Sequence, residues 1–523
     1  MSKQVTAAEL EDGAPFEAAR AIGRSLEDRL SSEEAMKKTH SDLEEMVSKA
    51  GTEWMRAMMA EHLELRARAE ARLGEVRDAK GDEHRRTRES ERHLETIFGR
   101  VAVPRLAYQK PGAADLHPMD ASLNLPKEVF SHGIRKMVAR DAVRMSFEDV
   151  VDQVEERTGA SIAKRQVEEL TVRAAQDFEA FYERKAEEQA SSQDLLVLST
   201  DGKGIAMRHE DLREGTRRAA EAKVKTLETR LSPGEKRQRK RMAQVAAVYT
   251  IPPFVRSAAD VIHTMRDKAK VDAKRPRPVH KRVFASVEKT QARVIAEMFD
   301  EAERRDPEHA RRWVALVDGE RNQLRSVRAE ARKRGVELTI VVDVVHVLEY
   351  LWSAARALFE GTNADVEGWV SQRLLALMSG RSGGDVSRTI RWWEKRAKGL
   401  TKERKAAVTK TCRYLSNRSR ATCLRYADAL RDGLPIATGV IEGACRYLVG
   451  DRMNRSGARW SLTGAEAVLR LRAIVASDDF EAYWAFHLER EHERNHAVRY
   501  AGQEVPNPLP PKRRGRAPLR RVK

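Results

Sequence analysis

The chain has 523 residues, too many for one ordinary hydrophobic core, so two to four domains are expected. It carries 98 Lys and Arg residues against 80 Asp and Glu, a net charge of +18 that favours a polyanionic partner, nucleic acid first, over a merely solvated surface. Three cysteines without a CxxC pattern argue against a disulfide framework, and no apolar run reaches the ~18 residues of a membrane span. These features predict a cytoplasmic protein without a membrane partner.

The beginning of the chain favours helices. Residues 1–93 are polar, with Trp54, Leu63 and other apolar residues at roughly helical spacing, which predicts a helical N-terminal arm or oligomerisation arm. The next stretch, 97–108, alternates apolar and polar residues around Pro104. This pattern is typical of a small hairpin or an edge strand. It opens a predicted DNA-binding region over residues 94–190.

A pair of short helices is expected inside this region. Ser146 is predicted to cap the first helix, with Asp149 at its third position, and Ser161 to cap the second after a break at Gly159. A short helix, a tight turn and a second helix with basic residues near its start are typical of a helix-turn-helix DNA reader. Any antiparallel helix pair would look similar, and that alternative stays open. The side chains predicted to reach DNA are Lys164, Arg165 and Gln166.

Three apolar strands ending in acids come next. Residues 195–203 are expected to form a strand that ends at Asp201, and the same pattern leads to Asp318 and to Asp343. Early strands followed by strands alternating with helices predict an α/β domain with a mixed sheet flanked by helices. This order resembles the ribonuclease H-like fold. Its first part is expected over residues 191–346.

The rest of the chain is predicted to be mostly helical. Residues 347–434 show no strand pattern and are expected to form an all-helical insertion. The core is expected to resume over 435–490, where Glu442 and Arg446 share one helix face. Residues 491–523 are expected to be a basic, Pro-rich, disordered tail.

Three of the acids suggest a metal site formed by Asp201, Asp318 and Glu442. Mg²⁺ prefers oxygen ligands and needs few protein carboxylates, because water and substrate phosphate complete its coordination. Two divalent ions about 3.5 to 4 Å apart can activate a water or a 3′-hydroxyl and stabilise the leaving oxygen. For each acid alone, a surface or capping role is the ordinary alternative.

Four longer stretches carry a family resemblance: STDGKG (199–204), VALVDGERNQL (314–324), VVDVVHVLEYLW (341–352) and GVIEGACRYLVGDRMNRSGARWSLTGAEAVLRLRA (439–473). Together they resemble the DDE transposases of bacterial insertion sequences, of the ISKra family, and the likeness covers about residues 95–485. The resemblance implies a ribonuclease H-like core that cuts and joins DNA with two Mg²⁺ ions, which Mn²⁺ can replace. It also implies terminal inverted repeats and target DNA as partners, a homodimer or larger assembly on DNA, and a nucleoid-associated location in a bacterial cytoplasm.

The resemblance also assigns roles to individual residues. Asp201 matches the first catalytic acid and Glu442 the third. Asp318 matches the second, with Asp343 and His346 as an accessory pair; Asp343 is the alternative ligand, and His346 could be an ordinary core histidine. Residues expected to face phosphates near the cut are Arg446, Arg452, Arg455 and Arg459, while Trp460 could stack on a base or pack in the core.

Two other functions fit the same residues. One is a DNA-binding protein derived from a transposase that no longer cuts DNA. The other is a structure-specific nuclease of the same fold, which cuts without joining. Intact acids at all three matched positions favour the transposase.

Overall fold

The computed structural model describes residues 15–185, 190–222, 239–266, 275–359, 364–455 and 457–509. The chain divides into two compact units. One unit is formed by residues 1–181 together with 481–523, and the other by residues 182–480. The first unit therefore joins residues from both ends of the chain.

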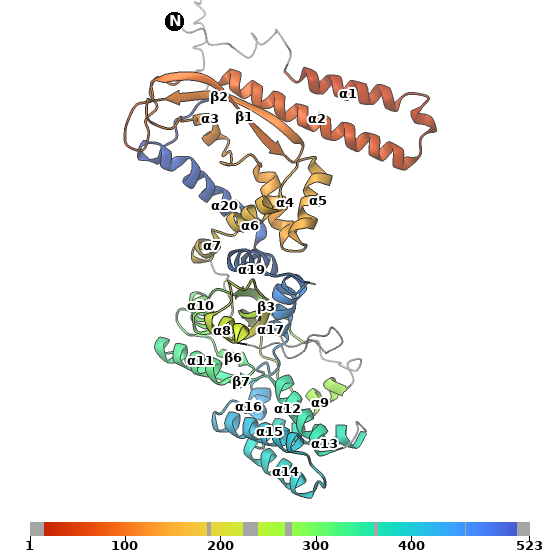
Figure 1. Cartoon of the computed structure of the whole chain (residues 1–523). Helices are drawn as coiled ribbons and strands as arrows, with labels where there is room; N and C mark the ends of the chain where they lie inside the picture. The colour runs from red at the N-terminus through yellow and green to blue at the C-terminus, as the bar shows by residue number, and fades with distance from the viewer. Residues whose placement is uncertain are drawn as a thin grey trace, which may run out of the picture. The chain divides into compact units, whose positions relative to one another are not determined.

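The first unit begins with two helices and a hairpin (Figure 1). Helices α1 (Glu17–Leu30) and α2 (His40–Ala69) pack together, and α2 also packs on strand β2 (Gly99–Gln109). β2 pairs antiparallel with β1 (Arg86–Thr96) over its whole length. β1 thus occupies the end of the range predicted to be helical. Its sequence is almost entirely polar, so the alternation typical of a strand is visible only in β2.

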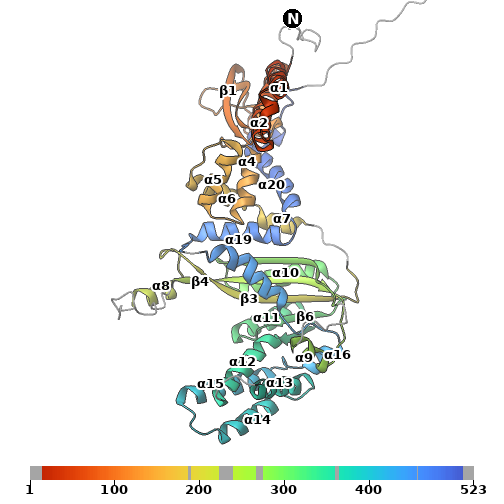
Figure 2. The same cartoon turned by 90° about the vertical axis from the view of Figure 1, so that its right-hand side faces the viewer.

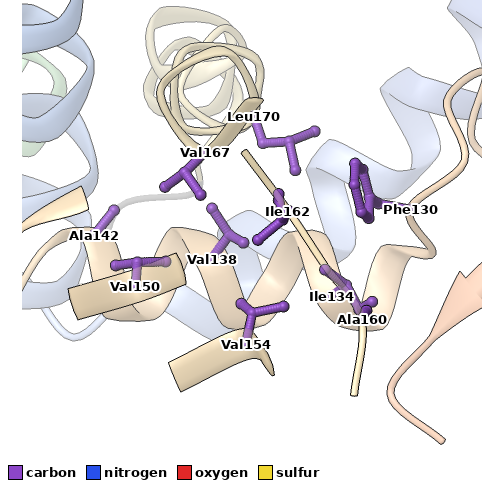
Figure 3. Packing of buried hydrophobic residues seen from close by; sticks show 10 residues of the cluster. All are labelled: Phe130, Ile134, Val138, Ala142, Val150, Val154, Ala160, Ile162, Val167 and Leu170. Carbon is purple, nitrogen blue, oxygen red and sulfur yellow. The ribbon is translucent and has the colours of Figure 1, made fainter. Parts of the chain in front are cut away.

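Three further helices enclose a small apolar core (Figure 3). They are α4 (His132–Ala142), α5 (Phe147–Thr158) and α6 (Lys164–Ala174). Ile134, Val154 and Val167 are among the fully buried side chains of this cluster. Packing of this kind supports three short helices that would not be stable in isolation.

The predicted boundaries of α5 and α6 are only partly correct. Ser146 caps α5, with Asp149 completing the capping box, as predicted. Gly159 follows the helix in the left-handed conformation, with φ 68°. The prediction that Ser161 caps the second helix is wrong, because α6 begins at Lys164. The connection first buries Ile162 in the three-helix core.

The C-terminal residues belong to the first unit. Helix α20 (Phe480–Asn495) is followed by two short 3-10 turns, Ala497–Arg499 and Ala501–Gln503. Tyr500 is buried against Tyr108, and the Ala71 N–H donates a hydrogen bond to the Pro508 carbonyl (2.9 Å). The prediction of a disordered tail is therefore wrong for residues 491–509, where buried contacts outweigh the polar composition. Residues 510–523 lie outside the described residues.

The second unit is built on a mixed five-stranded sheet with strand order β5-β4-β3-β6-β7. β3, β4 and β5 are antiparallel, whereas β6 and β7 run parallel to β3. The strands are β3 (Leu195–Ala206), β4 (Lys240–Ile251), β5 (Val279–Ser286), β6 (Trp313–Val317) and β7 (Leu338–Val342). Residues 195–200 of β3 and all of β6 are buried, as expected for strands covered on both faces.

Helices flank this sheet (Figure 2). α10 (Gln291–Arg305) and α17 (Gly439–Ala444) contact β3 and β4, and α19 (Leu462–Ala476) contacts β5. The predicted mixed sheet flanked by helices is thereby confirmed. The remaining α-helices before β7 in the described ranges are α3 (Pro118–Ser122), α7 (Phe178–Arg184), α8 (Glu214–Glu221), α9 (Ala258–Arg266) and α11 (Arg321–Arg334).

Only helices follow β7 in the described part of residues 344–431, as the sequence predicts. They are α12 (Val344–Leu358), α13 (Ala364–Met378), α14 (Gly383–Arg396), α15 (Lys402–Arg420) and α16 (Tyr426–Arg431). α17 then continues through a π-helical segment, Cys445–Gly450, into α18 (Asp451–Met453). None of the helices in the described ranges is both long and apolar enough to cross a bilayer.

Candidate functional site

The strand register places three acids in a row. The last paired residues of the parallel ladders are Thr200 with Val317, and Val317 with Val342. The residues that directly follow these pairs on β3, β6 and β7 are Asp201, Asp318 and Asp343. Because adjacent strands lie about 4.8 Å apart, these acids follow one another across the same edge of the parallel ladders.

Asp201 does not end its strand. β3 continues to Ala206 and remains paired with β4 beyond Asp201. The prediction that the strand ends at Asp201 is therefore wrong for the ladder between β3 and β4. On the side of β6 the ladder does stop at Thr200. Asp201 is therefore held by a paired strand on one side and faces the end of β6 on the other.

The carboxylate of Asp318 is partly buried and lies within electrostatic range of Asp201. Burial raises the pKa of Asp318 above its ordinary value, and the negative charge of Asp201 raises this pKa further. The backbone N–H of Glu320 donates to Oδ1 of Asp318 (3.0 Å), which partly offsets the increase. In the described part of the chain, no group donates a hydrogen bond to the second oxygen, Oδ2. Asp318 therefore keeps one carboxylate oxygen open to a ligand.

The turn after Asp318 depends on a glycine. Gly319 has φ +84°, a conformation that other residues rarely adopt. A Cβ atom there would also lie 3.0 Å from the Val342 side chain. The turn therefore fixes the direction in which the chain leaves β6.

Glu442 lies near the same edge, in the first turn of α17. Its pKa is raised by partial burial and then by the negative charges of Asp343 and Asp201. One turn later, the thiol of Cys445 donates a hydrogen bond to Oδ2 of Asp201 (3.3 Å). This contact joins the helix of Glu442 to the strand of Asp201. Burial, followed by the charge of Asp201, raises the pKa of Cys445, so the thiol stays protonated and can donate.

Asp343 is used differently from the other acids. It is 3% exposed, and its Oδ1 accepts the Val345 N–H (3.0 Å) as the N-cap of α12. Its Oδ2 accepts a hydrogen bond from the Thr438 hydroxyl. The Thr438 carbonyl in turn accepts the Glu442 N–H (3.0 Å) in the first turn of α17. Both oxygens of Asp343 are thus committed to protein donors that join the starts of α12 and α17.

His346 lies in the first turn of α12, three residues after Asp343. Its side chain is 36% exposed, so it is not the ordinary core histidine considered as an alternative. Nδ1 lies 3.3 Å from Oε2 of Glu349. His346 also lowers the pKa values of both Asp318 and Glu442, which partly opposes the effects of burial. The accessory position predicted for this residue therefore lies within electrostatic reach of two of the three acids.

Tyr414 of α15 was not predicted from the sequence. Its hydroxyl donates a hydrogen bond to the main-chain carbonyl of Asp318 (2.8 Å), and its ring stacks on Tyr350 with centroids 4.0 Å apart. The helices after β7 thereby support the residue that follows β6. Asp318 and Tyr414 are separated by 96 positions, so no local pattern could reveal the contact. Cys445 and Thr438 were missed for the same reason.

The four predicted arginines occupy different environments. Arg446 is 84% exposed and lies 3.8 Å from Asp451, and Arg455 and Arg459 are also exposed. Arg452 is 3% exposed, with its guanidinium over the Trp460 ring at 4.7 Å. The prediction that Arg452 faces DNA is therefore wrong in this structure, because the side chain is used in packing.

Trp460 is a core residue. It is buried, and its Nε1–H donates to the Met453 carbonyl (3.0 Å). Its backbone also forms a bridge with Met207, next to the end of β3. The alternative that Trp460 packs in the core is thereby confirmed. The buried Trp460 ring presents no exposed face on which a base could stack.

The residues predicted to read DNA lie exposed at the start of α6, as expected. Lys164 forms an ion pair with Glu148 (2.7 Å), and Arg165 with Glu169 (3.1 Å). The side-chain amide of Gln166 accepts the Ala163 N–H (3.0 Å). Helices α5 and α6 together carry seven acids and four basic residues. α5 and α6 form the predicted helix pair, but the excess of acids on these two helices does not favour binding to phosphates.

The carboxylates at the sheet edge offer the oxygen donors that Mg²⁺ and Mn²⁺ prefer. Within the described ranges, no three His, Cys, Asp or Glu side chains are already grouped tightly enough to hold a metal ion. The raised pKa of Asp318 shows that burial and the charge of Asp201 disfavour its carboxylate form, and a bound cation would reduce this unfavourable effect. The carboxylates are therefore of the chemical type that a hard divalent cation takes as ligands. Neither a protein-family model nor a curated protein matches this chain.

Proposed function

We propose that the chain is a DDE-type transposase of a bacterial insertion sequence, related to the ISKra family. In this proposal it binds terminal inverted repeats and catalyses Mg²⁺-dependent DNA cleavage and strand transfer. The observation that carries the proposal is that Asp201 and Asp318 directly follow the last residue pair of the ladder between β3 and β6, with Glu442 within electrostatic range on a helix packed against β3. The motif resemblance identifies the same three acids.

The topology supports a ribonuclease H-like core. Three antiparallel strands are followed by two that run parallel to the first, in the order β5-β4-β3-β6-β7. The helices α12 to α16 come between β7 and the helix of Glu442, which is the position proposed for an insertion in this core. These helices separate Glu442 from Asp201 and Asp318 in the sequence, but α17, which carries Glu442, packs against β3.

Asp201, Asp318 and Glu442 would hold the metal. Two bound Mg²⁺ ions, or Mn²⁺ in their place, would activate the attacking water or 3′-hydroxyl and stabilise the leaving oxygen. The protein prepares the position of each ligand: Cys445 holds Asp201, Tyr414 holds the backbone of Asp318, and Asp343 holds the start of the helix that carries Glu442. Asp318 is the preferred second ligand, because both oxygens of Asp343 already accept hydrogen bonds from the protein.

The assembly and location follow from the same proposal. Two transposon ends must be brought together before joining, so at least a homodimer on DNA is required. The first unit, with Lys164, Arg165 and Gln166, is proposed to contact the inverted repeats, and Arg446, Arg455 and Arg459 the phosphates near the cut. The protein would work in a bacterial cytoplasm, on the nucleoid.

Binding of Mn²⁺ in the absence of DNA is expected to stabilise the second unit. A ligand that binds only the folded state at 100 times its Kd adds about 2.7 kcal/mol to the free energy of unfolding. Thermal unfolding with increasing Mn²⁺ should therefore raise the Tm of the wild-type protein and leave that of Asp201→Asn nearly constant. Glu308→Gln, which changes an exposed acid outside the site, is the matched control and should respond like wild type. Equal shifts for Asp201→Asn and wild type would place the metal elsewhere.

The function itself is tested with the full chain and a labelled duplex that carries the end of the element flanking its own gene. Mg²⁺ or Mn²⁺ is added with an unlabelled target duplex, and EDTA is the control. Cleavage at the element end followed by joining to the target is the expected result. Cleavage without joining would instead support a structure-specific nuclease, and tight binding without cleavage a DNA-binding protein that no longer cuts.

A further inference from the structure

Helices α14 and α15 concentrate positive charge. α15 carries seven Lys and Arg residues and a single acid, Glu403, while α14 carries four basic residues and two acids. The two helices pack against each other. Their charge is thus opposite in sign to that of α5 and α6, where acids predominate. The predicted reader helices are not the most favourable surface for phosphates.

A groove of about 880 Å³ runs between α14 and α15. Its walls carry basic and hydroxyl side chains, and no Asp or Glu lines it among the described residues. The basic side chains are Arg388, Arg391, Lys395, Arg413 and Arg420. Thr409 and Ser419 are among the residues that add hydroxyl groups. Guanidinium, ammonium and hydroxyl donors together are the groups that most often contact phosphate oxygens.

Three of these basic side chains remain available. Arg388 pairs with Asp385, and Arg391 with Glu394 (2.9 Å). Lys395, Arg413 and Arg420 are exposed, and within the described residues none of them forms an ion pair. Arg413 and Arg420 are two helical turns apart, a rise of about 10 Å along one side of α15. This spacing suits an extended polyanion better than a single small anion.

The aromatic residue of the groove points to duplex DNA rather than to unpaired bases. Trp392 is 48% exposed, but the guanidinium of Arg396 lies 3.5 Å from its ring centroid. The Trp393 ring packs against it at 5.5 Å in an edge-on arrangement. A base that stacked on Trp392 would have to displace Arg396, whereas phosphate contacts leave this packing intact.

We propose that the groove between α14 and α15 binds the phosphodiester backbone of duplex DNA, independently of the contacts made by α6. The inference rests on the DNA partner of the proposed function and gives that partner a second surface. Binding there requires no base contact, so it adds affinity without sequence preference.

The test compares DNA binding by the wild-type chain and the variant Lys395→Ala/Arg413→Ala/Arg420→Ala. Binding to a duplex of random sequence is measured in EDTA over a range of salt concentrations. Each lost phosphate contact reduces the slope of log K against log salt by about 0.9. The triple variant should therefore bind more weakly at low salt and show a slope smaller by up to about 2.7. Unchanged affinity and slope would overturn the inference.

Two further variants separate a local contact from loss of charge or fold. Arg20→Ala/Arg24→Ala/Arg29→Ala removes the same charge from exposed positions of α1 and should keep the wild-type slope. Lys395→Arg/Arg413→Lys/Arg420→Lys keeps the charge and should restore binding to the duplex. Failure of this charge-conserving variant, with an unchanged Tm, would also contradict phosphate binding.

The remaining arms identify the ligand. The triple substitution should weaken binding to a single-stranded oligonucleotide of the same length less than it weakens binding to the duplex. A loss confined to the single strand would overturn the duplex assignment. If the wild-type chain binds no DNA, the proposed function fails together with the groove. If it binds DNA and the triple variant binds equally well, only the groove inference fails.

Discussion

Replacing Asp201 with Asn, or Glu442 with Gln, is expected to abolish Mg²⁺-dependent cleavage while DNA binding remains nearly unchanged. Each substitution removes a carboxylate that would hold the metal, and loss of several kcal/mol of transition-state stabilisation corresponds to a rate reduction on the order of 10³-fold or more. DNA binding should persist, because a carboxylate beside a phosphate contributes repulsion rather than affinity. Single-turnover cleavage and a binding titration in EDTA measure the two effects separately.

Glu349→Gln is the matched control for this experiment. Glu349 lies close enough to raise the pKa of Glu442, but it pairs with His346 and is not a proposed ligand. The control should retain most of the cleavage activity. Loss of DNA binding in Asp201→Asn or Glu442→Gln would show instead that these acids support the fold.

Asp318→Asn and Asp343→Asn are expected to fail in different ways. The charged form of Asp318 is disfavoured by burial and by Asp201, so its pKa is raised and its charge costs stability at neutral pH. Asn at this position should therefore abolish cleavage while the Tm without metal stays constant or rises. The hydrogen bond from the Tyr414 hydroxyl goes to the main-chain carbonyl of residue 318, so it is kept in Asp318→Asn.

Asp343→Asn should chiefly lower stability. The Asn side chain can still cap α12, but its amide nitrogen cannot accept the hydrogen bond of the Thr438 hydroxyl. Losing a buried hydrogen bond to a charged group costs about 1.5–3 kcal/mol. A lower Tm with partial cleavage at low temperature is therefore expected, and Thr438→Val should show the same pattern. Complete loss of cleavage in Asp343→Asn, with activity kept in Asp318→Asn, would reassign the second ligand.

The local parts of this structure could be predicted from the sequence. The apolar strands that lead to Asp201 and Asp318 are visible because strands buried on both faces are continuously apolar. β7, which leads to Asp343, is only partly buried, but its sequence is also mostly apolar. The cap at Ser146 is visible because its partner, Asp149, is only three residues away. The mixed sheet and the helical stretch after β7 followed from the order of such elements.

Other parts depend on contacts between distant residues. Cys445 touches Asp201 across 244 positions, and nothing near either residue indicates this contact. β1 was missed because its side chains are almost all polar, and the structure after residue 491 was missed because Tyr500 packs against residues near position 108. Arg452 was misread for a related reason, since only the fold shows that its charge lies over Trp460.

The order in which the chain is synthesised gives the division into two units a further consequence. The first unit needs α20 and Tyr500, so it cannot be completed until the ribosome has made the whole of the second unit. The second unit, residues 182–480, is continuous and can fold earlier during synthesis. A product that terminates after Glu442 but before residue 480 would contain the acids of the sheet edge but only an incomplete first unit. Premature termination would therefore yield protein with an unfinished apolar core, the kind of species that aggregates or is degraded before it could act on DNA.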